Sequence, residues 1–336
     1  MYRQQTHSIF SNASGAAIII REREAFCAEN PKSRSLFQKA AKETRPMPVF
    51  LLIFIPCLTF TVQTIAMKSV HARILRQNLL ITGILSALIA AGFGVYALFA
   101  ETHFSPLTFV LGAVFGAVYV TTLVSYYYAM QTGPLSYSSF FYSASMLIPA
   151  LAGLLIWKEP FTWQAGAGIA LFLAAFYLVS VPGAAKGQKI SGKWLLFCFM
   201  SWLFNGGCSL SVKAHQMAME GREGNEMLLV GYCTAALLSF GLYAVLRAKQ
   251  GPSGDFALVK AGALPLVLAA AGNGGGNAMV SYLASRVDSA YLYPIVLGGL
   301  LILVSVYSVC FLKEKMNRAG FAGLALGIAA IAVMNL

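Results

Sequence analysis

Long runs of apolar residues dominate the chain from Met47 to its end, and short polar connectors separate them. Each run holds about 20 residues, the length that a helix needs to cross a hydrocarbon layer of ~30 Å. Backbone groups in hydrocarbon must be hydrogen-bonded within their own segment, so we expect every run to be helical. The expected membrane-spanning helices cover residues 48–68, 78–100, 104–130, 136–157, 161–181, 193–215, 226–246, 258–285, 289–312 and 316–336. The pattern predicts an all-α, polytopic membrane protein with ten transmembrane helices.

The first 46 residues differ from the rest of the chain. They hold eight Lys and Arg and four Glu, many Ser and Asn, and no long apolar run. This composition favours a basic N-terminal tail that is disordered or only locally helical. The tail lacks the continuous apolar region and cleavage site of a secretory signal. Met47 directly precedes the first long apolar run and is an alternative start of the protein.

Composition and charge exclude several classes of protein. Hydrophobic residues make up 58% of the 336 residues and charged residues 11%, against about one quarter charged in soluble domains. The net charge of +12 arises from Lys and Arg at the ends of the runs, which favours contact with the lipid bilayer and not with nucleic acid. The six cysteines are scattered, without a CxxC pair or a histidine at ligand spacing. We therefore expect neither a disulfide framework nor a metal site, and no cofactor.

An internal repeat is the most informative feature of the sequence. Residues 156–175 (IWKEPFTWQAGAGIALFLAA) align without a gap on residues 311–330 (FLKEKMNRAGFAGLALGIAA), and eight of the twenty positions are identical. The matches include a Lys-Glu pair at the same distance from a matched glycine. Two five-helix copies, over residues 47–182 and 183–336, are the simplest explanation.

The odd number of helices in each copy has a topological consequence. The second copy must enter the membrane from the side opposite to the first, so the two repeats are inverted. Inverted repeats are typical of secondary transporters, in which the substrate binds near the bilayer midplane between the two halves. The sequence thus predicts alternating access between residues 47–182 and 183–336.

The duplicated segment resembles the drug/metabolite transporter superfamily in its ten-helix, EamA-like form. The resemblance rests on a short helix that ends in Lys-Glu and is followed by a Gly-rich helix: LLIWKEPFTWQAGAGIAL in the first half and YPIVLGGLLILVSVYSVCFLKEKMNRAGFAGLAL in the second. SAYLYPIVLGG, followed by LKEKM, is also similar to the third-helix region of small multidrug resistance proteins. The resemblance spans roughly residues 48–336. It implies transport of small metabolites, amino acids or drugs, usually outward in bacteria.

One departure from these relatives bears on the substrate. Small multidrug resistance proteins exchange protons for cationic drugs at a Glu in their first helix, whereas residues 48–68 and 193–213 contain no Asp or Glu. All eight acidic residues after position 46 fall at or near the ends of expected helices. Without a buried counter-charge, a neutral, zwitterionic or anionic small molecule, such as an amino acid, is favoured over a cationic drug. Drug efflux of the small multidrug resistance type is the alternative.

Polar residues recur at helical spacing in several expected helices. In hydrocarbon such stripes mark either contacts between helices or the wall of a wet cavity. The candidate substrate-binding residues in these stripes are Thr59, Gln63, Tyr119, Thr122, Tyr126, Trp202, Asn205, Ser209, Asn273 and Asn277. Asn273 and Asn277 stand among four glycines in GNGGGN (residues 272–277), which suits either a discontinuous helix facing substrate or close helix packing. A polar cavity lined by Asn205, Asn273 and Asn277 would distinguish a transporter from a membrane scaffold or sensor.

Charged residues at the helix ends allow two interpretations. Lys68 and Lys213 each end the first helix of a half and could bind a carboxylate or phosphate of the substrate; snorkelling to the lipid headgroups is the more common role of such lysines. Glu159 and Glu314 are expected to cap or orient the connection to the following Gly-rich helix. Gly323 and Gly327, spaced as GxxxG, suit close helix contact within the chain or in a homodimer.

The sequence offers no support for an enzyme. It lacks HExxH, GxSxG and paired acids at membrane depth, and its histidines lie in the tail or at helix ends. A multi-pass secondary transporter of the cell membrane, inner or plasma, is therefore the predicted function, with a small molecule and the lipid bilayer as its partners.

Overall fold

The computed structural model describes residues 47–70, 74–132, 135–180, 191–251, 255–311 and 318–334. The chain divides into two units, Met1–Leu51 and Leu52–Leu336. Of the first unit, only residues 47–51 are described, and they form the beginning of a helix. The expected tail over residues 1–46 lies outside the described residues. The account below concerns the second unit.

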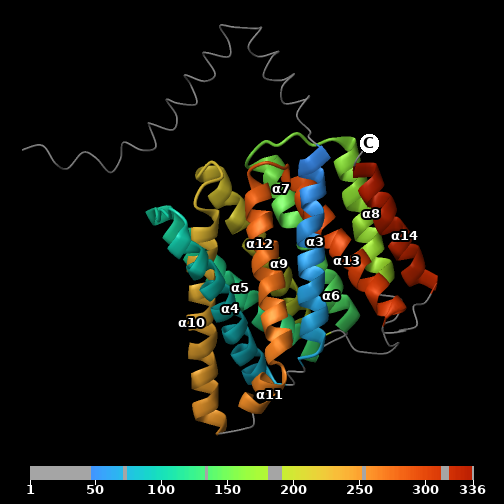
Figure 1. The fold of residues 1–336 in the computed structure, drawn as a ribbon. Coiled ribbons are helices and arrows are strands. Elements are labelled where there is room, and N and C mark those ends of the chain that lie inside the picture. Colours follow the sequence, from blue (N-terminus) through green and yellow to red (C-terminus); the bar gives the residue numbers. More distant parts are fainter. Residues whose placement is uncertain are drawn as a thin grey trace, which may run out of the picture. The chain divides into compact units, whose positions relative to one another are not determined.

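The regular structure of the described residues is helical throughout (Figure 1). The helices are α3 (Met47–Lys68), α4 (Leu75–Phe99), α5 (Pro106–Thr132), α6 (Leu135–Ala144), α7 (Leu147–Leu155), α8 (Trp163–Ser180), α9 (Gly192–Ala218), α10 (Gly224–Gln250), α11 (Asp255–Ala261), α12 (Ala263–Ala284), α13 (Ser289–Cys310) and α14 (Arg318–Met334). The prediction of an all-helical chain is confirmed for this part of the protein.

Two of the expected helices are each divided into a pair. The run 136–157 forms α6 and α7, which are separated at Ser145 and Met146, and the run 258–285 forms α11 and α12, which are bent by 73° at Gly262. A proline explains each break, because Pro149 and Pro265 are the third residues of α7 and α12. A proline ring clashes with the carbonyl four residues earlier, which here belongs to the residue at the break or just before it.

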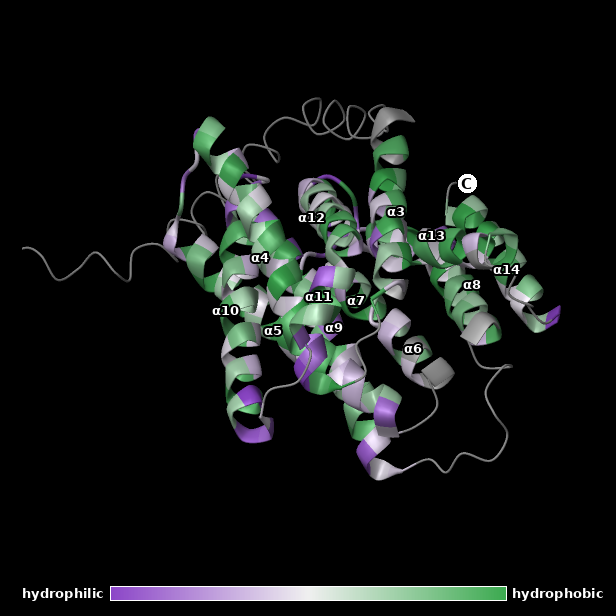
Figure 2. Cartoon of the chain, turned by 60° about the horizontal axis from the view of Figure 1, so that its bottom comes forward, coloured by the Kyte–Doolittle hydropathy of each residue, from purple (hydrophilic) through white to green (hydrophobic). Residues whose placement is uncertain are grey.

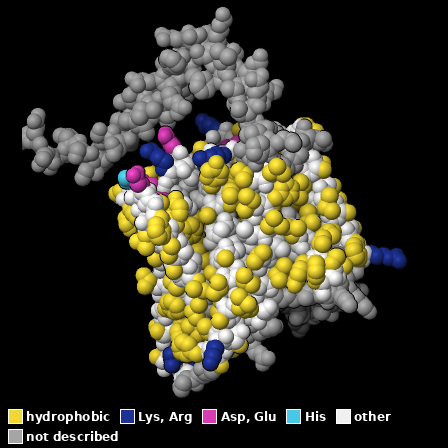
Figure 3. All heavy atoms as spheres, in the orientation of Figure 1, with side chains coloured by type: hydrophobic (Ala, Val, Ile, Leu, Met, Phe, Trp, Pro, Cys, Tyr) yellow, Lys and Arg dark blue, Asp and Glu magenta, His cyan; other side chains and the backbone are white. Residues whose placement is uncertain are grey.

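Several helices have the length and composition of membrane spans. Among the described residues, α4, α5, α9, α10 and residues 289–307 of α13 meet both criteria, and the bent pair α11 and α12 adds a sixth if it counts as one span. α3, α6 with α7, α8 and α14 contribute shorter apolar stretches. Hydrophobic residues extend along the helices, and hydrophilic residues gather at helix ends and connections (Figure 2). The face in Figure 3 is widely covered by hydrophobic side chains, with most of its charged side chains near the upper and lower margins.

Helices from distant parts of the sequence pack in pairs. The most extensive contacts join α4 with α10, α5 with α9, α8 with α14, and α5 with α10. Small residues allow the α5–α10 approach: a Cβ atom on Gly116 would lie 2.3 Å from the Gly231 carbonyl oxygen. Gly327 of α14 faces Ala175 of α8. The small-residue faces of these two helices therefore pack together within the chain, as small residues commonly do in membrane proteins.

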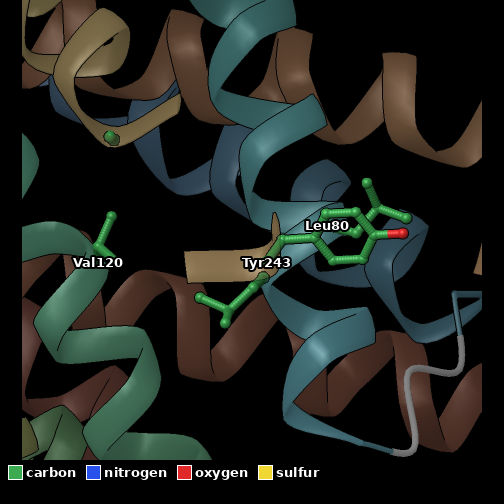
Figure 4. Close-up of a cluster of buried hydrophobic side chains, with 5 residues drawn as sticks. Leu80, Val120 and Tyr243 are labelled. Carbon is green, nitrogen blue, oxygen red and sulfur yellow. The ribbon is translucent and has the colours of Figure 1, made fainter. Parts of the chain in front are cut away.

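A buried apolar cluster joins α4, α5 and α10 near one end of α10. It consists of Leu79, Leu80, Val120, Ala235 and Tyr243. Three of these residues are labelled in Figure 4. Side chains from three helices pack together in this cluster.

Candidate functional site

A buried group of tyrosine and asparagine side chains connects three helices. The Tyr232 hydroxyl of α10 donates a hydrogen bond to Oδ1 of Asn273 in α12. Asn277, one turn further along α12, donates from Nδ2 to the same Oδ1 at 3.1 Å and to the Asn273 carbonyl oxygen at 3.0 Å. The ring of Tyr119, from α5, meets that of Tyr232 edge-on with 5.8 Å between centroids. We call Tyr119, Tyr232, Asn273 and Asn277 the central polar cluster.

Aromatic rings enclose this cluster on the side of α4 and α5. Phe93 stacks on the Tyr232 ring at 6.3 Å, and Phe115 meets it edge-on at 5.7 Å. Tyr232 and Asn273 are buried, whereas Tyr119 and Asn277 are half-buried. The cluster thus combines apolar ring faces with amide and hydroxyl groups, an arrangement that can hydrogen-bond a small polar molecule without a charged side chain.

The glycines around Asn273 bring α12 against α3. A Cβ atom on Gly272 would lie 2.5 Å from the Thr59 carbonyl oxygen and 2.9 Å from the Gln63 nitrogen. Residues 272–277 lie inside the continuous helix α12, so of the two alternatives the structure supports close helix packing and not a discontinuous helix at this segment. The helix is broken instead at Gly262. Thr59 and Gln63 are both half-buried, and the Thr59 hydroxyl donates to the Pro56 carbonyl of its own helix.

A second polar contact surrounds the break between α6 and α7. Asn205 of α9 donates from Nδ2 to the Ser145 hydroxyl at 2.6 Å and to the Tyr142 carbonyl at 3.4 Å. Its amide therefore binds polar groups at the point where the α6–α7 backbone leaves the helical pattern. The Tyr142 ring packs on that of Tyr126, with 4.8 Å between centroids.

The remaining residues of the predicted stripes have local partners. The Thr122 hydroxyl donates to the Val118 carbonyl of its own helix and lies 4.0 Å from the Cys208 sulfur. The Ser209 carbonyl accepts a hydrogen bond from the hydroxyl of Tyr293 in α13. Trp202 is half-buried and packs on Phe199, a contact that does not join it to the central polar cluster. The Lys68 side chain and Glu314 lie outside the described part of the chain.

Lys213 is buried, which contradicts snorkelling. Its side chain is 2% exposed, and its Nζ lies 2.5 Å from Oε1 of Glu159, whose side chain is 10% exposed. Nζ also donates to the Ala284 carbonyl oxygen at 2.7 Å. The Glu159 carboxylate accepts from the backbone N–H of Ser289 at 2.7 Å, so it caps α13 and ties the connector before α8 to the second half.

A second buried ion pair lies near the C-terminal end of α10. Arg76 of α4 places Nε 3.0 Å from Oδ2 of Asp255, and the two side chains are 3% and 1% exposed. Arg76 also donates to the Gly251 carbonyl oxygen at 2.9 Å. These two pairs overturn the expectation that the chain holds no buried counter-charge. The acidic partners do lie at or near helix ends, as the sequence indicated.

A carboxylate and a histidine meet at the N-terminal end of α10. Glu223 accepts from the Ser105 backbone N–H at 2.9 Å and from the Thr108 hydroxyl. The Thr108 hydroxyl lies 2.9 Å from Nε2 of the buried His215. Burial raises the pKa of Glu223, but the hydrogen bonds from Thr108 and Ser105 outweigh it and hold that pKa below its ordinary value.

Sequence reasoning missed Tyr232, Tyr142 and Ser145, all of which contact predicted residues. Tyr232 has no polar residue three or four positions away on either side, and the next polar residues on its face, Ser239 and Tyr243, lie seven and eleven positions on. A search for polar stripes therefore passes over it. A tyrosine inside an apolar run could have identified this position, since a buried tyrosine hydroxyl needs a hydrogen-bond partner.

Comparison with known proteins gives a limited similarity to a transport protein. No family model matches the chain. The chain is 34% identical over 83 residues to the probable 4-amino-4-deoxy-L-arabinose-phosphoundecaprenol flippase subunit ArnF of Klebsiella pneumoniae subsp. pneumoniae. That match covers 24% of this chain and 64% of ArnF, which is less than two thirds of the relative's length.

Comparison of folds gives a more extensive match. A solved crystal structure resembles the chain with a TM-score of 0.67 and covers 86% of this chain and 98% of its own, at 15% sequence identity. At this identity the likeness concerns the fold alone. With the apolar helices and the similarity to a flippase subunit, these findings support the conclusion that the chain is a multi-pass helical membrane protein.

Proposed function

We propose that this protein is a secondary transporter that moves a small polar metabolite across the cell membrane by alternating access. The two inverted repeats would be residues 47–182, containing α3 to α8, and residues 183–336, containing α9 to α14. The observation that carries the proposal is the central polar cluster, in which Tyr119 of the first half meets Tyr232 of the second, whose hydroxyl binds Asn273. Uncharged polar groups buried between two halves are suited to a transported solute.

The pairing of helices supports two related halves. The second helices of the halves, α4 and α10, pack on each other, and so do the fifth helices, α8 and α14. The third helix of the first half packs on the first helix of the second, α5 on α9. The reciprocal contact, α12 on α3, is made at Gly272 and Gly276. A two-fold relation between the halves would produce this reciprocal pattern, and the likeness to an EamA-like transporter is part of the same proposal.

The chemistry of the cluster favours a neutral, zwitterionic or anionic substrate, such as an amino acid. A cationic drug would need a carboxylate at membrane depth. The described residues of α3 and α9 hold none, and the cluster presents only hydroxyl and amide groups. The similarity to ArnF supports transport as the class of function, and a lipid-linked substrate is the second candidate on that basis.

Cysteine labelling tests the inverted repeats. Trp163 and Arg318, the first residues of α8 and α14, are matched positions of the sequence repeat and are both exposed. We expect Trp163→Cys and Arg318→Cys, made singly in a cysteine-free background, to react with a membrane-impermeant maleimide from opposite sides of intact vesicles. Labelling of both positions from the same side would refute the inversion.

Substitution of the central asparagines tests transport. Metabolites whose levels differ between overproducing and deleted cells identify the substrate, and Asn273→Leu with Asn277→Leu should abolish that difference. The control is Asn78→Leu, because the Asn78 amide donates to the Ile74 carbonyl of its own turn. Tyr232→Phe, which removes a single hydroxyl and keeps the ring, should weaken transport. Unchanged transport in the double variant, at equal protein in the membrane, would exclude these residues from the path.

A further inference from the structure

The Glu159 carboxylate occupies a position with three hydrogen-bond donors from the second half of the chain. Oε1 lies 2.5 Å from Nζ of Lys213 and accepts from the Ser289 hydroxyl at 3.3 Å. Oε2 accepts from the Ser289 backbone N–H at 2.7 Å. Ser289 is the first residue of α13, a helix of 22 residues, so the positive end of the helix dipole also faces the carboxylate. An ammonium group, a hydroxyl and a helix N-terminus together form a complete set of contacts for an oxyanion.

Lys213 requires an anion in this position. The side chain is 2% exposed, and among the described residues it also donates to the carbonyl oxygens of Ala284 and Val287, at 2.7 and 3.4 Å. Carbonyl groups accept hydrogen bonds but do not neutralise the charge. Removal of one member of a buried ion pair leaves an uncompensated charge, which is strongly unfavourable. A conformation in which Glu159 withdraws is therefore favoured when another anion takes its place.

Glu159 is carried by a segment that can withdraw more easily than a helix. It lies in the connector between α7 and α8, where residues 158–162 have no regular structure. The preceding Lys158 adopts the left-handed backbone conformation, with φ of 51°. The Glu159 side chain is 10% exposed, against 2% for Lys213, so the carboxylate forms the outer side of the pair. Gly153 leaves space for it, since a Cβ atom there would lie 2.2 Å from Oε2.

We propose that Lys213 with the backbone N–H and hydroxyl of Ser289 forms a binding site for an oxyanion, a carboxylate or phosphate group of the substrate, and that Glu159 fills this site when the substrate is absent. The assignment of the anion to the substrate rests on the proposed transport function. Substrate and Glu159 exclude each other, because both need the same three donors. Binding of the substrate then breaks the contacts of Glu159 with α9 and α13 of the second half, which links occupancy of the site to movement between the halves.

Anion binding to purified protein tests the site without a transport assay. Glu159→Gln removes the competing charge and keeps the side-chain length, so inorganic phosphate should bind this variant at least about tenfold more tightly than the wild type, or about 1.4 kcal/mol. Titration calorimetry in detergent at constant ionic strength measures the difference. The matched control is Glu159→Gln with Lys213→Gln, which should lose the gain. Equal phosphate binding by the single and double variants would overturn the proposal.

Further variants keep the test decisive and identify the kind of anion. If Glu159→Gln is too unstable to purify, Glu159→Asp, with its carboxylate drawn back by one methylene, should show a smaller gain in phosphate affinity; no gain would overturn the proposal. Ser289→Ala in the Glu159→Gln background should weaken phosphate binding several-fold. Parallel titrations with acetate, inorganic phosphate and phosphatidic acid in mixed micelles distinguish a carboxylate, a free phosphate and a lipid headgroup. If the protein binds phosphate in this way but transports nothing, the proposed function is refuted and the anion-binding site is still supported.

Discussion

The two buried ion pairs have similar chemistry but differ in the secondary structure to which their charged residues belong. Arg76 and Asp255 lie near the C-terminal end of α10, and Lys213 and Glu159 near its N-terminal end, where α9 leads into α10. The 27 residues of α10 separate these ends by about 40 Å. Asp255 begins α11 and also contacts the Tyr243 hydroxyl of α10 at 3.4 Å, so both members of its pair belong to packed helices. Glu159, by contrast, belongs to an irregular connector.

This difference separates a static ion pair from an exchangeable one. Separating Arg76 from Asp255 would part α4 from α11, and it would also break the contacts of Arg76 with the Gly251 carbonyl and of Asp255 with the Tyr243 hydroxyl. Removing Glu159 from Lys213 requires a change only in the connector that precedes α8. Burial alone therefore does not identify a functional ion pair in this protein. The secondary structure that carries each charge is equally important, because it sets how much packing must be lost when the pair opens.

The largest expected effect concerns the static pair. Asp255→Asn leaves the Arg76 guanidinium buried without its counter-charge and should lower the free energy of unfolding by about 3–5 kcal/mol. Unfolding in mixed micelles, followed by circular dichroism, measures the loss. The control is the double variant Arg76→Met with Asp255→Leu, which removes both charges and should be much less destabilised. Equal losses in the single and double variants would show that packing, and not the charge, dominates at this end.

A smaller loss is expected at the exchangeable pair. Glu159→Gln keeps an acceptor for Ser289 but removes the charge beside Lys213, and should cost about 1.5–3 kcal/mol in a buffer without oxyanions. Added inorganic phosphate should recover part of this loss, because it binds the folded protein at Lys213. Asp255→Asn should show no such recovery, since Arg76 is enclosed by packed helices. If phosphate restored stability in both variants, the two pairs could not be distinguished as static and exchangeable.

The sequence predicted the helices better than it predicted the side-chain contacts. Apolar runs identify helices because hydrocarbon leaves the backbone no other partner. The break at Gly262 could also be predicted, since Pro265 follows it by three residues. The glycines of residues 272–277 suggested a break as well, but the helix continues through them. Those glycines serve packing against α3, which depends on a neighbour more than 200 positions away in sequence. Helical periodicity contains no information about such a neighbour.

The candidate site shows the same limit. Asn273 and Asn277 were found because they share one face of one helix, a local property. Tyr232 was missed because its partner lies on another helix, 41 residues away. Lys213 was expected to bind either a substrate anion or the lipid headgroups, because it ends an expected helix, and nothing near it in sequence indicates Glu159. Polar contacts between helices arise from tertiary packing, so a single sequence indicates the candidates but not their pairs.

Close packing between α5 and α10 offers a further test, because this crossing lies between the two ion pairs at the ends of α10. Gly116→Ala places a methyl group 2.3 Å from the Gly231 carbonyl oxygen at the α5–α10 crossing and should cost about 1–3 kcal/mol of unfolding free energy. Gly94→Ala in α4 is the control, because nothing lies within 4 Å of its added Cβ, and it should be neutral or slightly stabilising. If both variants were equally stable, the helices at this crossing would not be held by backbone contact.

The smallest expected effect concerns the pH dependence at the N-terminal end of α10. The Ser105 and Thr108 hydrogen bonds hold the pKa of Glu223 below its ordinary value, so the carboxylate stabilises the fold above the unfolded pKa of about 4.3. This contribution is lost as the pH falls through the lower, folded pKa. Glu223→Gln should therefore lower stability near about pH 7 and make the decline toward about pH 3 less steep than in the wild type.

Unfolding midpoints over this pH range measure the effect, and Glu226→Gln, one turn into the same helix, controls for the loss of one negative charge. Because Glu223 is partly exposed, the difference should be smaller than that of any substitution at the two buried pairs. Identical pH profiles for Glu223→Gln and Glu226→Gln would mean that the contacts with Ser105 and Thr108 do not stabilise the charge.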